Sequence, residues 1–107
     1  MARAVVSRRL LEDGTVVLDL RGELDVAVND ALRDVLEQTI QVERPPMVMV
    51  NMRHVTFVDS TGMGALVAGL KAARDQQVRF SVQGVAPFVE KQLRIAGLYE
   101  TLVSPPR

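Results

Sequence analysis

The chain contains no cysteine and no tryptophan, and it has one histidine and one tyrosine among its 107 residues. Without cysteine, neither a disulfide nor a thiolate metal site can form. With one histidine, a zinc ion would depend on carboxylate ligands, and the acidic residues show no ligand-like clustering. We therefore expect no metal site, and a domain held together by its hydrophobic core.

Net charge is absent as well, because 13 basic and 13 acidic side chains give a formal value of +0. A nucleic-acid-binding protein needs a concentrated basic face, so the mixed charges argue against that class. No apolar run is long enough to span a membrane, and the start of the chain, with Arg3, lacks a signal-peptide core. The sequence thus predicts a cytoplasmic protein that binds neither nucleic acid nor membrane.

Hydrophobic residues are plentiful, at 48% of the chain, which predicts a folded globule and argues against disorder. The length suits a single domain with one core. We expect one domain over residues 1–107, with an ordered core at about 4–103 and a frayed tail at 104–107.

The first residues predict a β-hairpin. Apolar runs at residues 4–11 and 15–20 flank the pair Asp13-Gly14, whose residues tolerate the backbone conformation of a hairpin turn. We expect the runs to pair as antiparallel strands.

A first helix follows the hairpin. Asp25 suits its N-cap, with Asn29 as a second possible start. Apolar residues at helical spacing extend the helix to Ile40, and the prolines within residues 43–46 stop it.

The middle of the chain predicts a buried strand, a connection and a second helix. Residues 47–52 form a nearly continuous apolar run, typical of a central strand covered on both faces. Residues 53–58 form a more polar connection to a corner, and a helix that includes residues 65–73 follows this corner and closes at Gln76-Gln77. Its stripe at i, i+3, i+4 and i+7 is expected to face the sheet and consists of Met63, Leu66, Val67 and Leu70.

Residues 78–82 alternate as a strand does, and Pro87 suits the first turn of a helix that Gly97 ends. Residues 98–103 predict a short strand or a last helical turn. The fold class is therefore α/β, with a mixed sheet opened by the hairpin and with packed helices. Helix-connected strands should be parallel, so the Asp25 loop is expected at the same edge as the loop before the second helix.

Residues 58–64 (VDSTGMG) form the corner between the buried strand and the second helix. A helix N-terminus there offers unpaired N–H groups and a positive dipole end to an anion. The glycines let another molecule approach the backbone. A simple helix cap by Asp59 or Ser60 explains the same residues, and local chemistry alone favours the cap.

The sequence gives little support to an enzymatic function of this corner. His54, Asp59 and Ser60 have the residue types of a nucleophilic triad, but they lie too close in sequence and lack the Gly-x-Ser-x-Gly elbow. Residues 62–64 (GMG) are too short for a dinucleotide fingerprint, and no Gly-Lys-Ser/Thr follows for a Walker loop. We predict no enzyme activity and no cofactor.

Residues 21–25 (RGELD) and 57–64 (FVDSTGMG) together resemble the two signatures of STAS domains. Within that family the likeness is greatest to the bacterial anti-sigma factor antagonists. The first segment alone is a weak signal, whereas the pair, in order and at the correct separation, is fairly specific. The resemblance covers nearly the whole chain.

The resemblance implies a partner-switching module. In that family, an unphosphorylated antagonist binds an anti-sigma factor that is also a serine kinase, and so frees a sigma factor for stress-response or sporulation genes. Phosphorylation by the kinase ends binding, and a serine phosphatase resets the switch. The phosphoacceptor falls on Ser60, with Thr61 as the alternative. The implied partner-binding surface consists of Glu23, Asp25, Asp59, Ser60, Thr61, Gly62 and Met63.

Two other functions remain open. A STAS domain can be a scaffold or accessory subunit of a signalling or lipid-transport complex, but such a subunit has no need of the Ser60 hydroxyl. An esterase that uses Ser60 would need an assembled base. Asp25 and Asp59 can also serve only as caps, and the protein is expected to be a monomer or weak dimer.

Overall fold

The computed structural model describes residues 4–103. It contains a mixed β-sheet with the strand order β1-β2-β3-β4. The strands are β1 (Ala4–Leu10), β2 (Val16–Leu24), β3 (Met47–Val58) and β4 (Arg79–Gln83). β1 pairs with β2 antiparallel, and β2, β3 and β4 are parallel to one another. The predicted hairpin and the mixed sheet are thus confirmed, and the predicted tail at 104–107 lies outside the described residues.

After the β1–β2 hairpin, each further strand is preceded and followed by helical segments. They are α1 (Asn29–Gln38), which continues into a π-helical turn η1 (Thr39–Glu43), then α2 (Ser60–Asp75), α3 (Pro87–Ile95) and α4 (Tyr99–Leu102). Pro87 occupies the first turn of α3 as expected. The last apolar segment forms a helical turn, α4, rather than a strand.

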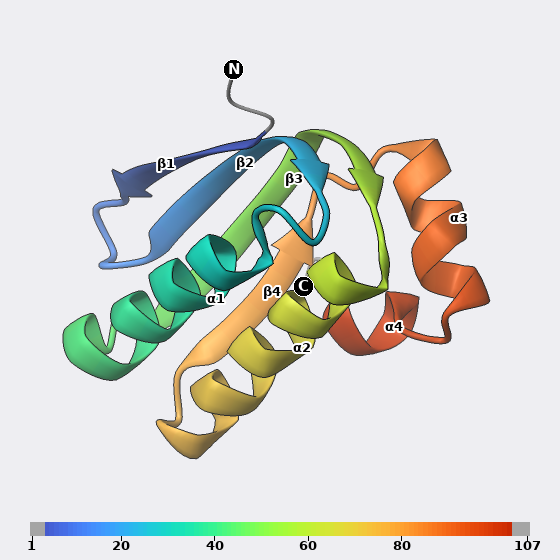
Figure 1. Cartoon of the computed structure of the whole chain (residues 1–107). Helices are drawn as coiled ribbons and strands as arrows, with labels where there is room; N and C mark the ends of the chain where they lie inside the picture. The colour runs from blue at the N-terminus through green and yellow to red at the C-terminus, as the bar shows by residue number, and fades with distance from the viewer. Residues whose placement is uncertain (1–3, 104–107) are drawn as a thin grey trace.

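Helices α1 and α2 lie side by side on one face of the sheet (Figure 1). The strand order explains this, because β2, β3 and β4 step across the sheet in one direction. Right-handed crossovers that step in the same direction place their helices on the same face. Helix α3 packs beside β3, towards the side of the sheet where β4 lies (Figure 1).

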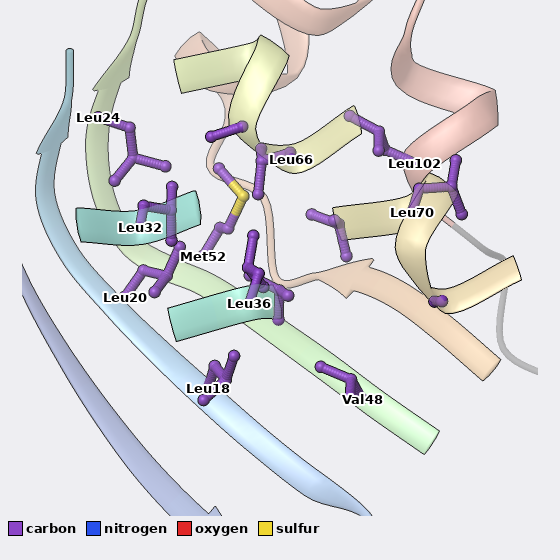
Figure 2. Close-up of a cluster of buried hydrophobic side chains, with 14 of the residues drawn as sticks. Leu18, Leu20, Leu24, Leu32, Leu36, Val48, Met52, Leu66, Leu70 and Leu102 are labelled. Atoms are coloured by element: carbon purple, nitrogen blue, oxygen red, sulfur yellow. The ribbon is translucent and has the colours of Figure 1, made fainter. Parts of the chain in front are cut away.

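The hydrophobic core fills the space between these helices and the sheet. Figure 2 shows Leu36 of α1, Met52 of β3 and Leu66 of α2 gathered there, and each has 0% of its surface exposed. The core extends to α3 and α4, whose buried residues are Val89, Leu93 and Leu102.

Strand β3 differs from its prediction in two ways. Val48, Val50 and Met52 are buried while their neighbours are half-buried, so β3 is not covered equally on both faces. The predicted polar connection at residues 53–58 is the second half of the same strand. Register shifts beside this half break the two-residue alternation, because a bulge sets one extra residue against its partner strand. The polar residues of this second half of β3 therefore have the sequence pattern of a loop.

The start of α1 also differs from its prediction. Val28 is the N-cap, and no side chain caps the helix. Asp25 instead accepts a hydrogen bond from the backbone N–H of Ala27 (3.0 Å), and its carbonyl accepts one from Val28 (3.1 Å). A carboxylate that bonds two residues ahead closes an Asx turn. Asp25 therefore shapes the loop before α1, and the helix begins at the second predicted position, Asn29.

Within residues 4–103, no helix is both long enough and apolar enough to cross a membrane.

Replacing Leu36 by Ala should lower the free energy of unfolding by about 2–5 kcal/mol, because a large buried side chain is lost and a cavity remains. The same replacement at Leu10, which is 63% exposed, is the matched control and should cost far less. Chemical denaturation of both variants measures the difference. Equal losses would contradict the placement of the core.

Candidate functional site

The two sequence signatures meet at one edge of the sheet. Leu24, the last residue of β2, pairs with Val58, the last residue of β3. The N–H of Asp59 then donates a hydrogen bond to the carbonyl of Leu24 (3.1 Å). The loop that carries Asp25 therefore lies next to the corner at the start of α2, as the parallel arrangement predicts.

Asp59 is the N-cap of α2. Its Oδ1 accepts hydrogen bonds from the N–H of Gly62 (2.9 Å) and from the hydroxyl of Thr61 (2.6 Å). Its carbonyl also accepts the N–H of Met63 (2.9 Å). The bond from the Thr61 hydroxyl, followed by the bond from the Gly62 backbone, lowers the pKa of Asp59 below its ordinary value of 3.8. The capping role expected from local chemistry is confirmed for Asp59.

Ser60 and Thr61 present their hydroxyls differently. Thr61 is half-buried and donates its hydroxyl hydrogen to Asp59. Ser60 is exposed at the first position of α2, and no hydrogen bond of its side chain is found in the part of the chain that the structure describes. Of the two candidate phosphoacceptors, Ser60 is therefore the one with a free, accessible hydroxyl.

Gly62 is buried, and its role follows from packing. A β-carbon on Gly62 would lie 2.3 Å from the carbonyl oxygen of Leu24 and 2.9 Å from the Leu24 β-carbon. No side chain fits there without moving the backbone of β2 away from α2. Gly62 thus shapes the corner from within.

Beside the corner, Glu23 is exposed and Asp25 is half-buried. The next residue, Val26, has 74% of its surface exposed. Sequence reasoning did not select Val26, although an apolar residue directly after the RGELD signature was a visible signal.

A groove of about 540 Å³ runs from Ser60 along α2. Its walls come from α1 and from the segment that joins α3 to α4, and its lining residues are Arg33, Ser60, Met63, Gly64, Val67, Ala68, Lys71, Ala96 and Leu98. We call it the α2 groove. Of these lining residues, only Ser60 and Met63 were predicted from the sequence to bind a partner, because the walls from α1 and the α3–α4 segment are brought to α2 by the fold.

The predicted apolar stripe of α2 is thereby divided. Leu66 and Leu70 are buried in the core as expected. Met63 and Val67 are half-buried and line the α2 groove. The spacing alone could not separate these two neighbouring faces of the helix, because a stripe at i, i+3, i+4 and i+7 spans both.

No nucleophilic triad is assembled around Ser60 within residues 4–103. The capping bonds of Asp59 go to Thr61 and Gly62, and His54 is exposed on β3. In the same residues, no group of three or more histidine, cysteine or acidic side chains could hold a metal ion.

The fold matches that of solved protein structures. The solved structure of the anti-sigma factor antagonist SpoIIAA in its unphosphorylated form superposes with a TM-score of 0.77 and 21% sequence identity, covering 96% of this chain and 90% of that one. The Bacillus SpoIIAA structure in the phosphorylated form gives 0.72 and 20%, covering 96% and 93%. At such identities the likeness establishes the fold.

The sequence relatives share more identity with this chain than these two solved structures do. The STAS domain family model matches residues 10–105, and the chain belongs to the STAS domain family. An anti-sigma-B factor antagonist of Staphylococcus aureus is 32% identical over 81 residues, covering 76% of this chain and 74% of the relative. An anti-sigma F factor antagonist of Paenibacillus polymyxa is 26% identical over 89 residues, covering 83% and 76%. The resemblance stated from the two signatures is confirmed.

Replacing Asp59 by Ala should destabilise the protein by about 1 kcal/mol, because α2 loses its cap. The pKa of Asp59 is lowered by folding, so its stabilising effect is complete well above pH 3.8 and is lost as the pH falls through the folded pKa. The difference from the unmodified protein should therefore shrink in acid. Denaturation across this pH range measures it, and Asp59→Asn, which keeps an acceptor, is the control. A difference that does not change with pH would exclude this role.

Proposed function

We propose that the chain is an anti-sigma factor antagonist that acts as a binding module in the cytoplasm and not as an enzyme. In the unphosphorylated state it binds an anti-sigma factor that is also a serine kinase, and so frees a sigma factor. The kinase phosphorylates Ser60 and ends the binding, and a serine phosphatase reverses the change. The names of the S. aureus and P. polymyxa relatives support the general activity.

The observation that carries the phosphorylation step is the contrast between the two hydroxyls at the corner. Ser60 is exposed at the start of α2, while the hydroxyl of Thr61 is held by Asp59. A kinase needs an accessible hydroxyl whose lone pairs are free to attack a phosphoryl group. Ser60 meets this requirement without any rearrangement of the cap.

The physics of phosphorylation at Ser60 supports a switch that does not unfold the domain. A phosphate would add about −1.5 to −2 charges at neutral pH. Within the domain, the N-terminus of α2 favours negative charge. A partner packed against Ser60, Asp59 and Asp25 would meet an added negative charge beside these two carboxylates, together with the added bulk of the phosphate. A penalty of about 3 kcal/mol would weaken binding about a hundredfold.

The neighbouring residues supply the remaining surface for such a partner. Glu23 is exposed near the end of β2, Val26 is exposed on the loop that follows β2, and Met63 is half-buried one turn into α2. We assign these residues to the partner-binding surface together with Asp25, Asp59, Ser60 and Thr61. Gly62 contributes by setting the spacing between β2 and α2.

Incubation with ATP and the anti-sigma kinases of the source organism should add one phosphate to the protein, detected by intact mass and mapped to Ser60. Ser60→Ala should abolish the modification. Thr61→Ala keeps the exposed Ser60 hydroxyl and is the matched comparison, in which the phosphate should still map to Ser60. A phosphate that persists in Ser60→Ala and disappears in Thr61→Ala would move the site to Thr61.

Binding of the same anti-sigma factors should distinguish the two states. Ser60→Ala should bind with the affinity of the unmodified protein, and Ser60→Asp should bind more weakly because it places a negative charge in the interface. Calorimetric titration measures both. Equal affinity of all three forms, with no modification by any kinase, would instead favour the scaffold or accessory-subunit function.

A further inference from the structure

Gly64 has no evident role in the fold. A β-carbon added to it would meet no atom within 4 Å, whereas the same atom on Gly69 of α2 would lie 3.0 Å from Leu36. Glycine in a helix interior is less favourable than alanine. Within the described chain, nothing requires the absence of a side chain at Gly64. Because this glycine lowers helix stability and relieves no clash within the described chain, its lack of a side chain favours contact with another molecule.

The side chains around Gly64 form a second face of α2. Ser60, Gly64, Val67 and Lys71 recur at helical spacing, and all of them line the α2 groove. Ser60 and Lys71 are eleven positions apart, which corresponds to about 16 Å at the 1.5 Å rise of an α-helix. The floor is largely apolar, with half-buried Met63, Val67 and Leu98. Its length therefore matches about three turns of a second helix.

Charges of one sign line the groove, while the carboxylates of the partner-binding surface, Glu23, Asp25 and Asp59, are outside its lining. Its lining contains Arg33 and Lys71 but no aspartate or glutamate. Neither of these cations is in an ion pair within residues 4–103, where the ion pairs involve Arg8, Arg9 and Arg94. The overall charge of the chain is balanced, so this arrangement is local. It complements an acidic ligand that also has an apolar face.

We propose that the α2 groove receives an acidic amphipathic helix of the anti-sigma factor, with its backbone closest to the chain at Gly64 and its carboxylates near Arg33 and Lys71. This inference rests on the proposed function and specifies the partner segment. A helix that docks through an apolar stripe needs a groove of this kind. Gly64, facing the docked helix, allows the backbones of that helix and of α2 to approach each other.

The same arrangement gives the switch a direct cause, because Ser60 lines one end of the α2 groove. A phosphate on Ser60 would repel the carboxylates of the bound helix and attract Arg33 in their place. The loss of affinity on phosphorylation should therefore be larger at low salt than at high salt, since salt screens exposed charges.

Calorimetric titration with the anti-sigma factor kinases of the source organism tests the proposal on the full chain. Arg33→Gln and Lys71→Gln should each weaken binding by roughly three- to tenfold at low salt and less at high salt. The matched control is Lys91→Gln, an exposed lysine on α3 outside the groove, which should bind as the unmodified protein does.

Gly64→Ala separates the groove from the fold. The variant should melt at a higher temperature, because alanine is the better helix former. It should nevertheless bind the partner at least about tenfold more weakly, because the added methyl group keeps the two backbones apart. A loss of binding without a loss of stability is an effect that a merely structural glycine would not produce.

The outcomes distinguish this inference from the function on which it rests. If the groove variants bind like the unmodified protein while Ser60→Asp binds weakly, the groove assignment is wrong and the antagonist function stands. If the unmodified protein binds none of these anti-sigma factors, the proposed function fails and the groove assignment fails with it.

Discussion

The close approach of Gly62 to the carbonyl of Leu24 is the contact on which the rest of the corner depends. A β-carbon there would lie 2.3 Å from the carbonyl oxygen, so only glycine allows α2 to start this near to β2. The hydrogen bond from Asp59 to the same carbonyl fixes the start of α2. Together these contacts bring the RGELD and DSTGMG segments, which are far apart in sequence, to one edge of the sheet.

Asp59 connects the stability of the corner with its chemistry. Its carboxylate caps α2 and holds the hydroxyl of Thr61, and the exposed Ser60 between them makes no such bond in the described structure. The capping role of Asp59 and the proposed role of Ser60 therefore depend on the same turn. The residues that hold the turn are also the ones that leave a single hydroxyl accessible at the positive end of a helix.

Much of this could be predicted from the sequence, because the signals were local. The hairpin, the start of α2 at the corner and Pro87 at the start of α3 each depend on a few adjacent residues. The class of protein came from two short segments whose order and separation are specific.

The error at Asp25 was local, whereas the other two errors came from features that depend on distant residues. Asp25 has the chemistry of a helix cap, yet it closes a turn because the helix begins only at Asn29. Residues 53–58 looked like a connection because the bulges that disturb their alternation lie between two strands. The α2 groove was missed because Arg33 and Leu98 join it only when α1 and the α3–α4 segment pack around α2.

We expect one added phosphate to change what the corner can bind and to leave the fold unchanged. Comparison of backbone amide NMR spectra of the unphosphorylated and phosphorylated protein tests it most directly. We expect shift changes confined to the first turns of α2, the Asp25 loop and the groove wall around Arg33, with the core amides of β2 and β3 unaffected. Changes spread through the buried strands, or loss of their signals, would show that phosphorylation acts by rearranging the fold and would contradict this account.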